Sequence, residues 1–242
     1  MNDYILITGA SRGIGRAISL KFAKEGYNII ILSKNSYKDL LELCEICKKY
    51  NVECIPHECD ISDYNELIML REYIISLKIN VSCIINNAGI SYFGLLQDMD
   101  INDWNNIINT NLSSVFYTCK LFLPEMISRQ NGRIINISSV WGNVGASCEV
   151  AYSASKGGVN AFTKALAKEL APSHISVNAI ACGAIDTSMN RRLSPEEKSE
   201  LESEIPYGRM GLDTEAAETV YNLFISPSYL TGQIITMDGG WT

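Results

Sequence analysis

Short apolar runs alternate with amphipathic segments along the whole 242-residue chain. Short apolar runs predict buried β-strands, whereas apolar positions that recur every three to four residues predict helices. We expect strands at residues 4–7, 28–32, 52–59, 82–85, 132–137, 175–180 and 233–237. We expect helices at residues 13–26, 40–50, 63–77, 101–128, 152–170 and 214–224. Strands and helices that alternate in this way form a parallel sheet covered on both faces, so the pattern predicts a single α/β domain, residues 1–242, with about seven strands.

The segment after the first expected strand is rich in glycine. It reads Thr8-Gly9-Ala10-Ser11-Arg12-Gly13-Ile14-Gly15 and leads directly into the first expected helix. Glycines at such a place let backbone N–H groups approach a pyrophosphate at the helix N-terminus, and ligands of parallel sheets bind at the carboxyl ends of the strands. This context predicts a dinucleotide site in a doubly wound sheet of the Rossmann type. A plain turn is the alternative, because the spacing Gly-x-x-x-Gly-x-Gly differs from the common Gly-x-Gly-x-x-Gly.

The second expected strand ends at Ser33-Lys34, where an NAD site usually has an acidic residue that binds the ribose 2′-hydroxyl. Lys34 and Arg12 are cations, and they suit a 2′-phosphate, so the sequence favours NADP(H) over NAD(H). The alternative is that Lys34 is only solvated. Asp60 follows the third expected strand, and we expect it to accept a hydrogen bond from the adenine amino group.

Tyr152 and Lys156 lie four residues apart in an expected helix and therefore on the same helical face. An ammonium close to a phenol favours the ionised phenol, so this spacing is typical of a proton-transfer pair. The pair alone is weak evidence, because a half-buried tyrosine beside a solvated lysine is the more common arrangement.

Composition narrows the classes of partner. The formal net charge of −7 argues against nucleic acid and anionic membranes as partners. No apolar run approaches the roughly 18 residues that span a bilayer, and residues 1–4 lack the pattern of a signal peptide. We therefore expect a cytoplasmic protein.

Four of the eight cysteines and one of the two histidines lie close together in the sequence, at Cys44, Cys47, Cys54, Cys59 and His57. The spacing of Cys44 and Cys47 occurs in zinc sites. However, the same positions belong to an expected helix and strand, where cysteines pack as small apolar residues. We expect neither a metal nor a disulfide here.

Several motifs together resemble the short-chain dehydrogenase/reductase family. They are the glycine segment, Asn86-Asn87-Ala88-Gly89, Ser139, and Tyr152-x-x-x-Lys156, and the similarity extends to Asp238-Gly239-Gly240. The resemblance implies a catalytic tetrad of Asn111, Ser139, Tyr152 and Lys156. It also implies cofactor contacts at Gly9, Ser11, Arg12, Gly13, Ile14, Gly15, Ser33, Lys34, Asp60, Ile61, Asn87, Ala88, Gly89, Tyr152, Lys156, Gly183, Ile185 and Thr187.

The resemblance further implies the chemistry of a carbonyl reductase. Hydride would come from NADPH, Tyr152 would protonate the carbonyl oxygen, and Ser139 would stabilise its developing charge. Lys156 would lower the pKa of Tyr152 and bind the nicotinamide ribose, and Asn111 would hold a proton-relay water. One departure from the family pattern is Cys182-Gly183, where relatives usually have Pro-Gly.

Three functions remain open from the sequence. The chain looks most like bacterial 3-oxoacyl-acyl-carrier-protein reductases of fatty acid biosynthesis. The segment 141–149 also resembles reductases of the 5-aminopentanone group on elongation factor P, with Trp141, Val144 and Glu149 as expected substrate contacts. The third possible function belongs to a different functional class: a dinucleotide-binding sensor without catalytic activity. Relatives are commonly tetramers, so the resemblance implies a homotetramer or homodimer. We expect residues 186–205 to form a helical flap over the substrate.

Overall fold

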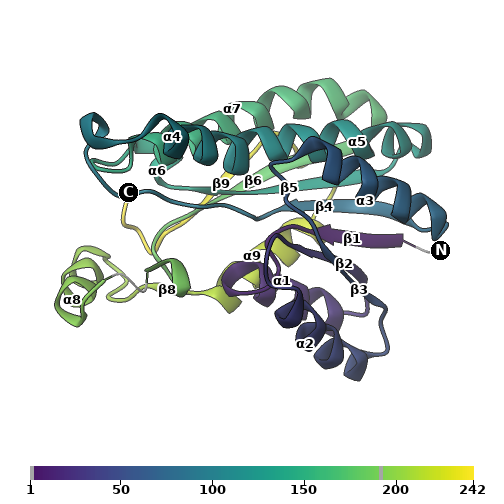
Figure 1. The fold of residues 1–242 in the computed structure, drawn as a ribbon, viewed down its shortest axis with the longest axis horizontal. Helices are drawn as coiled ribbons and strands as arrows, with labels where there is room; N and C mark the ends of the chain where they lie inside the picture. Colours follow the sequence, from purple (N-terminus) through teal and green to yellow (C-terminus); the bar gives the residue numbers. More distant parts are fainter. Residues whose placement is uncertain (1–2, 191–192) are drawn as a thin grey trace.

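The computed structural model of the protein describes residues 3–190 and 193–242. Seven parallel strands form one sheet in the order β3-β2-β1-β4-β5-β6-β9. This arrangement confirms the expected doubly wound sheet (Figure 1). The seven strands are β1 (Asp3–Ile7), β2 (Asn28–Ser33), β3 (Cys54–Glu58), β4 (Asn80–Asn86), β5 (Gly132–Ser139), β6 (Ile175–Cys182) and β9 (Ile234–Met237). Two short strands, β7 (Ile185–Asp186) and β8 (Gly211–Leu212), pair separately beside the sheet.

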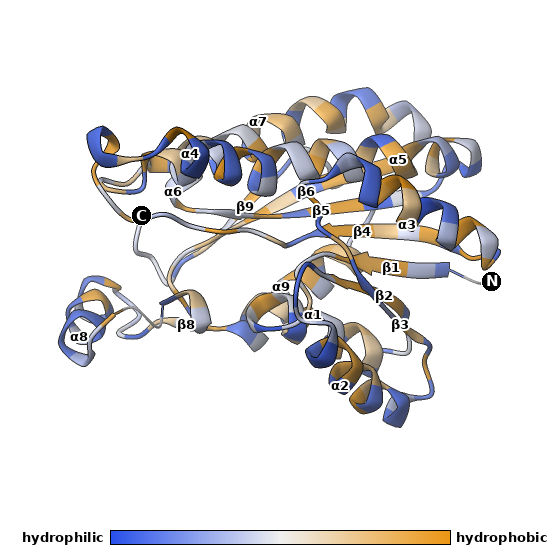
Figure 2. Ribbon diagram, in the orientation of Figure 1, coloured by the Kyte–Doolittle hydropathy of each residue, from blue (hydrophilic) through white to orange (hydrophobic). Residues whose placement is uncertain are grey.

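Helices cover both faces of the sheet, because successive side chains of a strand point to opposite faces. In β2, Ile29 and Ile31 pack on one side, against α1 (Gly13–Lys24), α2 (Tyr37–Cys47) and α9 (Asp213–Ile225). Ile30 and Leu32 pack on the other side, in a cluster with α3 (Tyr64–Ser76), α5 (Ser114–Arg129) and α7 (Val150–Leu170). The strands are mostly apolar, and the helices are apolar mainly on their inner sides (Figure 2).

The helical region expected at 101–128 is not one regular helix. It consists of α4 (Ile101–Ile108), a π-helical turn (Asn109–Ser113) and α5. The π turn holds one extra residue and lies at Asn111, whose side chain exchanges hydrogen bonds with the backbone of Ile90 at 2.8 and 2.9 Å. π-helical turns inside α-helices occur frequently at functional sites.

The strand order reverses between β1 and β4, which are neighbours in the sheet although β2 and β3 lie between them in sequence. In a parallel sheet this switch point opens a crevice at the carboxyl ends of the strands. The glycine segment after β1 and the Asn-Asn-Ala-Gly segment after β4 both lie there. The fold therefore brings together the motifs that the sequence analysis singled out.

Two further findings concern membrane-spanning helices and metal sites. No helix within the described ranges is long and apolar enough to cross a membrane. All eight cysteines are free thiols, and among residues 3–190 and 193–242 no group of three or more His, Cys, Asp or Glu side chains is placed to hold a metal ion.

Candidate active site

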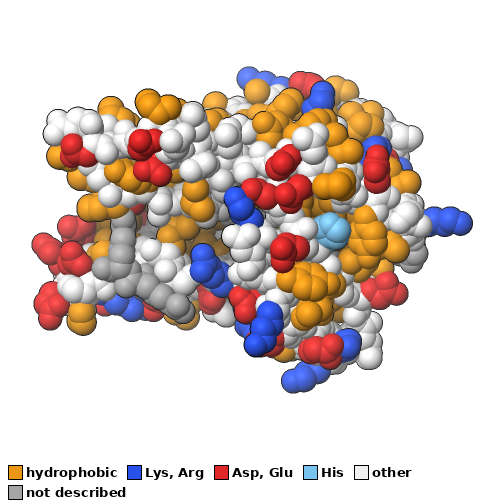
Figure 3. All heavy atoms as spheres, in the orientation of Figure 1, with side chains coloured by type: hydrophobic (Ala, Val, Ile, Leu, Met, Phe, Trp, Pro, Cys, Tyr) orange, Lys and Arg blue, Asp and Glu red, His pale blue; other side chains and the backbone are white. Residues whose placement is uncertain are grey.

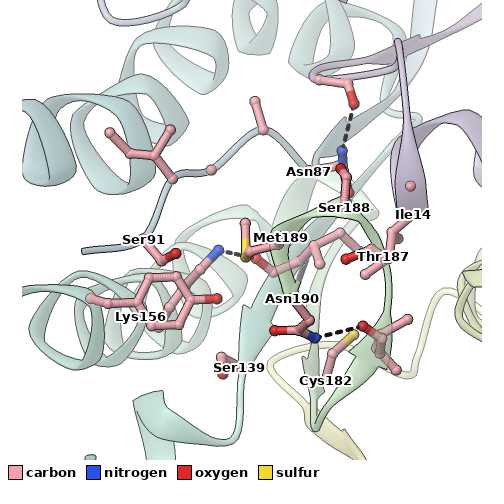
Figure 4. A pocket seen from close by; sticks show the side chains of 18 of the residues that line it. Ile14, Asn87, Ser91, Ser139, Lys156, Cys182, Thr187, Ser188, Met189 and Asn190 are labelled. Carbon is pink, nitrogen blue, oxygen red and sulfur yellow. Dashed lines mark hydrogen bonds between the residues drawn. The ribbon is translucent and has the colours of Figure 1, made fainter. Parts of the chain in front are cut away.

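A cavity of about 1410 Å³ opens at the carboxyl edge of the sheet. Side chains from the glycine segment (Ile14), from the middle of the chain (Ser139, Lys156) and from the segment after β7 (Thr187) surround the same space (Figure 4). Most of the residues expected at the site line this cavity. They are Gly9, Ser11, Arg12, Gly13, Ile14, Ser33, Lys34, Asp60, Ile61, Asn87, Ala88, Gly89, Ser139, Trp141, Glu149, Tyr152, Lys156, Gly183, Ile185 and Thr187.

Three expected residues do not line the cavity. Gly15 lies under the glycine turn, where a Cβ would come within 2.2 Å of the Gly9 carbonyl oxygen. Asn111 is buried behind the cavity wall. Val144, at the end of α6 (Trp141–Val144), is 62% exposed and lies outside the cavity lining.

Asn87 locks the glycine turn against the end of β4. Its side-chain amide donates to the carbonyls of Thr8 (2.9 Å) and Gly9 (3.1 Å), and its backbone N–H donates to the Thr8 hydroxyl. Gly9 has a φ of +66°, and a Cβ there would lie 2.7 Å from the Cα of Ala88. Only glycine fits this backbone conformation and this approach to Ala88, so the turn packs directly against the segment that follows β4. Sequence reasoning named the glycines and Asn87 but missed Thr8, whose hydroxyl also accepts from Ala88 N–H at 3.0 Å.

Lys34 and Asp60 form an ion pair at the mouth of the cavity, with a distance of 2.6 Å between Nζ and Oδ2. The other carboxylate oxygen of Asp60 accepts from the backbone N–H and the hydroxyl of Ser62. Burial opposes ionisation of Asp60, but the hydrogen bonds from Lys34 and Ser62 outweigh it and lower the pKa of the carboxyl. Asp60 therefore holds the Lys34 ammonium beside Ser33, a contact that the sequence analysis did not anticipate.

Tyr152 and Ser139 both line the cavity, and the Ser139 hydroxyl lies near the phenol of Tyr152. Burial raises the pKa of the phenol well above its ordinary value, and the nearby Ser139 hydroxyl offsets only part of this effect. The Ser139 hydroxyl also accepts from Trp141 N–H at 3.2 Å, which fixes its orientation. The tyrosine is thus held as a protonated phenol next to a second hydroxyl, the state that a general acid needs.

Lys156 is 4% exposed, and its ammonium donates to the Ile137 carbonyl at 2.7 Å. Its Nζ lies 5.7 Å from the centroid of the Tyr152 ring. Burial lowers the pKa of Lys156 to about 8. The expectation that Lys156 lowers the pKa of Tyr152 is not met in this structure, because desolvation dominates both groups.

We expect the rate of carbonyl reduction to fall about tenfold per pH unit above about pH 8, because Lys156 loses its charge there while Tyr152 stays protonated. The check is kcat/KM of the wild-type enzyme measured from about pH 6 to about pH 10. A Lys164→Ala variant, changed on the exposed side of the same helix, should show the same profile. A rate that stays constant to pH 10 would contradict this assignment of Lys156.

Asn111 connects the π turn to the catalytic helix. Its side-chain amide donates to the Ser155 hydroxyl at 3.0 Å, and Ser155 precedes Lys156 in α7.

A second set of buried polar side chains joins β4, β5, α5 and α7 below the site. Asn86 donates to Asn136 (2.9 Å), Asn136 donates to Thr163 (2.8 Å) and Thr118 donates to Asn86 (2.8 Å). Sequence reasoning named Asn86 as part of a motif but missed Asn136, Thr163 and Thr118, although an asparagine in an otherwise apolar strand is a signal for such a network.

The Cys182-Gly183 segment keeps the geometry of the site without a proline. Cys182 is the neighbour of Ser139 in the sheet and is 5% exposed, and its carbonyl accepts from Val140 N–H at 2.9 Å. A Cβ at Gly183 would lie 2.8 Å from the Cα of Asp238, so the glycine allows the C-terminal segment to approach. Hydrogen bonds and close packing hold this part of the cavity wall in place.

The segment after β7 forms the outer wall of the cavity. Helix α8 (Pro195–Glu204) begins with a capping box of Ser194 and Glu197, and Lys198 pairs with Asp186 at 3.0 Å. α8 lies to one side of the body of the fold (Figure 1). Its cavity-lining residues are Glu197, Glu200, Leu201 and Glu204. Acidic side chains gather on this side of the surface (Figure 3). Arg191 and Arg192 of the expected flap lie outside the described residues.

On the opposite wall, Glu149 lies one helical turn before Tyr152 and is 9% exposed. Trp141 also lines the cavity, and its ring packs against Trp241 with 4.8 Å between the centroids. The substrate end of the cavity thus combines one aromatic wall with carboxylates from two different elements.

Comparison with known proteins shows which protein family this chain belongs to. The family profile described as short chain dehydrogenase matches residues 3–198. The chain belongs to the short-chain dehydrogenase family.

Relatives of this short-chain dehydrogenase cover nearly its whole length. It is 40% identical to the uncharacterized oxidoreductase YmfI of Bacillus subtilis, over 100% of this chain and 99% of the relative. It is 38% identical to the 3-oxoacyl-[acyl-carrier-protein] reductase FabG of Staphylococcus aureus, over 99% of this chain and 98% of the relative. The crystal structure of a 3-oxoacyl-[acyl-carrier protein] reductase from Brucella melitensis superposes with a TM-score of 0.91 at 33% identity, covering 99% of this chain and 91% of the other.

A short-chain dehydrogenase is an oxidoreductase that acts on a carbonyl–alcohol pair and binds a nicotinamide dinucleotide. The cavity fits such a cofactor. The turn at Gly9 leaves no room for a side chain, and the N-terminus of α1 presents backbone N–H groups that suit a pyrophosphate.

Proposed function

We propose that this short-chain dehydrogenase is an NADPH-dependent reductase that converts a ketone into a secondary alcohol. The observation that carries the proposal is the convergence of Ser139, Tyr152 and Lys156 in the cavity that the glycine turn borders. A dinucleotide sensor would not need a protonated phenol and a hydroxyl placed side by side, so the geometry favours catalysis over sensing.

Each residue of the site has a separate task in this proposal. The bound cofactor supplies the hydride. The Tyr152 hydroxyl gives its proton to the carbonyl oxygen, and the Ser139 hydroxyl donates a hydrogen bond to the same oxygen as negative charge develops. The Lys156 ammonium binds the nicotinamide ribose, and Asn111 keeps the π turn and α7 in register through Ser155.

Preference for NADPH rests on the charges near the end of β2. Lys34 and Arg12 line the cavity beside Ser33, and Asp60 holds the Lys34 ammonium in place. A 2′-phosphate is doubly charged near neutral pH, and two cations with a hydroxyl are suitable partners for it.

We expect Lys34→Asp to raise the KM for NADPH about tenfold or more, because the new carboxylate repels the 2′-phosphate and also faces Asp60. The KM for NADH should change much less. Lys38→Asp is the matched control, because Lys38 is exposed on α2 and lies outside the cavity lining, and its KM for NADPH should stay near the wild-type value. Equal use of NADH and NADPH by the wild-type enzyme would refute the cofactor assignment.

The first candidate substrate is a 3-oxoacyl thioester on acyl carrier protein. Relatives named as reductases of this substrate are 38% identical over nearly the whole chain. The surface around the cavity argues against an acidic carrier, since α8 has five glutamates and one lysine and the whole chain has a net charge of −7.

The second candidate is the 5-aminopentanone group on elongation factor P, and the charge of the cavity favours it. Glu149 lies on the inner wall, and Glu197, Glu200 and Glu204 lie on the outer wall. Carboxylates attract a protonated amine, most strongly where the surroundings are partly desolvated. The substrate end of the cavity therefore suits a ketone that has a cationic end.

The test is NADPH oxidation with an acetoacetyl thioester and with aminopentanone-modified elongation factor P, measured side by side. If the second candidate is right, Glu149→Gln and Glu200→Gln each raise the KM for the amine substrate about tenfold, with a small effect on the thioester. Glu202→Gln is the control, because Glu202 is on α8 but does not line the cavity. Faster turnover of the thioester, unaffected by these variants, would favour the first candidate.

We also propose that residues 186–205 act as a flap over the substrate. The Lys198–Asp186 ion pair lies within the segment itself, and α8 has no buried residue. We expect amide exchange in residues 195–204 to slow several-fold when cofactor and substrate analogue bind together, because closure removes the helix from water. Helix α3, on the far side of the sheet, provides the internal control. Equal exchange rates of α8 with and without ligands would contradict the flap.

The protein is further proposed to assemble as a homotetramer or homodimer. Large apolar side chains are exposed near the start of α4 and on α5, with Ile101 74% and Phe116 48% exposed. A partner that covers this surface would remove them from water.

A further inference from the structure

Three cysteines meet where the C-terminal half of α2 packs against the start of β3. Cys44 and Cys47 are one turn apart on α2, and Cys54 is the first residue of β3. We call Cys44, Cys47 and Cys54 the thiol cluster. It lies at the amino-terminal end of β3, whereas Asp60 and the cavity lie beyond the carboxyl end of the strand.

The sulfurs of the thiol cluster are in direct contact. The Sγ atoms of Cys44 and Cys54 are 2.7 Å apart, and the Cys44 thiol also approaches the Cys54 carbonyl oxygen at 3.3 Å. A disulfide bond of about 2.05 Å between the sulfurs of Cys44 and Cys54 therefore requires only a small further approach of the helix and the strand. Cys47 lies near enough to Cys54 for the two thiols to influence each other's ionisation.

Access and ionisation differ among the three thiols. Cys44 is 7% exposed and Cys47 is fully buried, but Cys54 is half-buried, so the cluster reaches the surface at Cys54. The neighbouring Cys54 thiol lowers the pKa of Cys47 despite burial, and the charge of Arg16 adds to this effect. By contrast, burial raises the pKa of Cys83 and of Cys119 to about 12. A thiolate is therefore favoured at Cys47 relative to these isolated buried thiols.

We propose that the thiol cluster is an oxidation site that reacts with hydrogen peroxide and ends as a disulfide between Cys44 and Cys54. The Cys47 thiolate attacks one peroxide oxygen, the O–O bond breaks, and the leaving hydroxide takes up a proton to become water. The Cys54 sulfur then displaces the hydroxyl of the resulting sulfenic acid, which leaves as a second water with the Cys54 proton. Two thiols are oxidised by two electrons, and one peroxide is reduced to two waters.

The third thiol completes the reaction by exchange. Cys44 lies 2.7 Å from Cys54, so its sulfur attacks the Cys54 sulfur of the first disulfide and releases Cys47 as a thiolate. The thiol with the lower pKa leaves fastest in such an exchange. The final disulfide joins α2 to β3, and Cys47 returns to its starting state.

The experiment uses the full-length protein treated with hydrogen peroxide at neutral pH, alkylated, and digested with trypsin. Cleavage after Lys38, Lys48, Lys49 and Arg71 places Cys44 and Cys47 on residues 39–48 and Cys54 on residues 50–71. We expect the intact protein to lose two hydrogen atoms and these two peptides to be linked, and dithiothreitol to separate them. Fragmentation of the linked pair distinguishes Cys54 from Cys59.

Variants separate the roles of the three sulfurs. Cys54→Ser should abolish the linked pair, Cys44→Ser should leave a linkage from Cys47 to Cys54, and Cys47→Ser should slow its formation about tenfold or more. Cys148→Ser is the matched control, because Cys148 is also half-buried but lies outside the cluster, and it should form the linked pair at the wild-type rate. A wild-type protein that keeps all four cysteines of these two peptides alkylatable after peroxide treatment, or that links a different pair, would overturn the proposal.

Discussion

We expect the Tyr152→Phe enzyme to reduce its substrate about 10² to 10⁴-fold more slowly than the wild type, the range typical of lost general acid catalysis. Phenylalanine keeps the ring and removes the hydroxyl that lies near Ser139. This loss corresponds to about 3 to 5 kcal/mol of barrier. Because the hydroxyl is the proton donor and not a cofactor contact of the glycine turn, the affinity for NADPH should change little. Single-turnover kinetics and an NADPH titration measure the two quantities separately.

Two comparisons make the Tyr152 result specific. Tyr207→Phe removes an exposed hydroxyl outside the cavity and should leave the rate unchanged. Lys156→Ala should lower both turnover and NADPH affinity, and the double variant with Tyr152→Phe should be little slower than the worse single variant, because the two groups act as one unit. A folded Tyr152→Phe enzyme that binds NADPH and keeps a near wild-type rate would end the proposed mechanism.

Replacing Gly15 by alanine should weaken NADPH binding severely. The new Cβ would lie 2.2 Å from the Gly9 carbonyl oxygen and 2.5 Å from the Asn87 amide nitrogen, so the glycine turn has to open. Overpacking of this kind costs about 1–3 kcal/mol, which corresponds to roughly 5- to 150-fold in affinity if it appears in binding. Isothermal titration with NADPH measures the affinity, and thermal unfolding reports whatever part of the cost appears in stability.

The control for Gly15 is a second Gly→Ala change in a helix. At Gly157 in α7 a Cβ would meet only the Gly142 carbonyl oxygen, at an ordinary 3.5 Å. We expect Gly157→Ala to keep the wild-type affinity within about twofold, because alanine is a good helix former and nothing has to move. Wild-type NADPH affinity and melting temperature for Gly15→Ala would show that the turn is not as tightly packed as the structure indicates.

Features that depend on neighbours in sequence were predictable. The seven strands and the doubly wound order follow from apolar runs separated by helical periodicity, and both are confirmed. The glycine turn and the pair of Tyr152 and Lys156 were visible for the same reason, since a turn and an i, i+4 spacing are local properties. The expected strand 52–59 is shorter in the structure, Cys54–Glu58, because the ladder with β2 determines where pairing begins and ends.

The irregularity at Asn111 was not predictable from periodicity. Residues 101–128 have continuous helical character in the sequence, but the helix adds a π turn so that the Asn111 side chain can exchange hydrogen bonds with the Ile90 backbone. Ile90 is 21 residues away in sequence. A contact of this range competes with the regular helical pattern only once the chain is folded.

By itself, the sequence determined the fold class, the place of the dinucleotide site and the identity of the residues that are candidates for catalysis. Only the tertiary structure decided their electrostatic states. Burial lowers the pKa of Lys156 and raises that of Tyr152, and the Asp60 carboxylate holds Lys34. It also decided that α8 turns three glutamates towards the cavity while Val144 stays outside, and that Cys44 meets Cys54. The physical reason is that desolvation and charge pairing depend on distances between elements, whereas apolar periodicity and turn chemistry are contained in neighbouring residues.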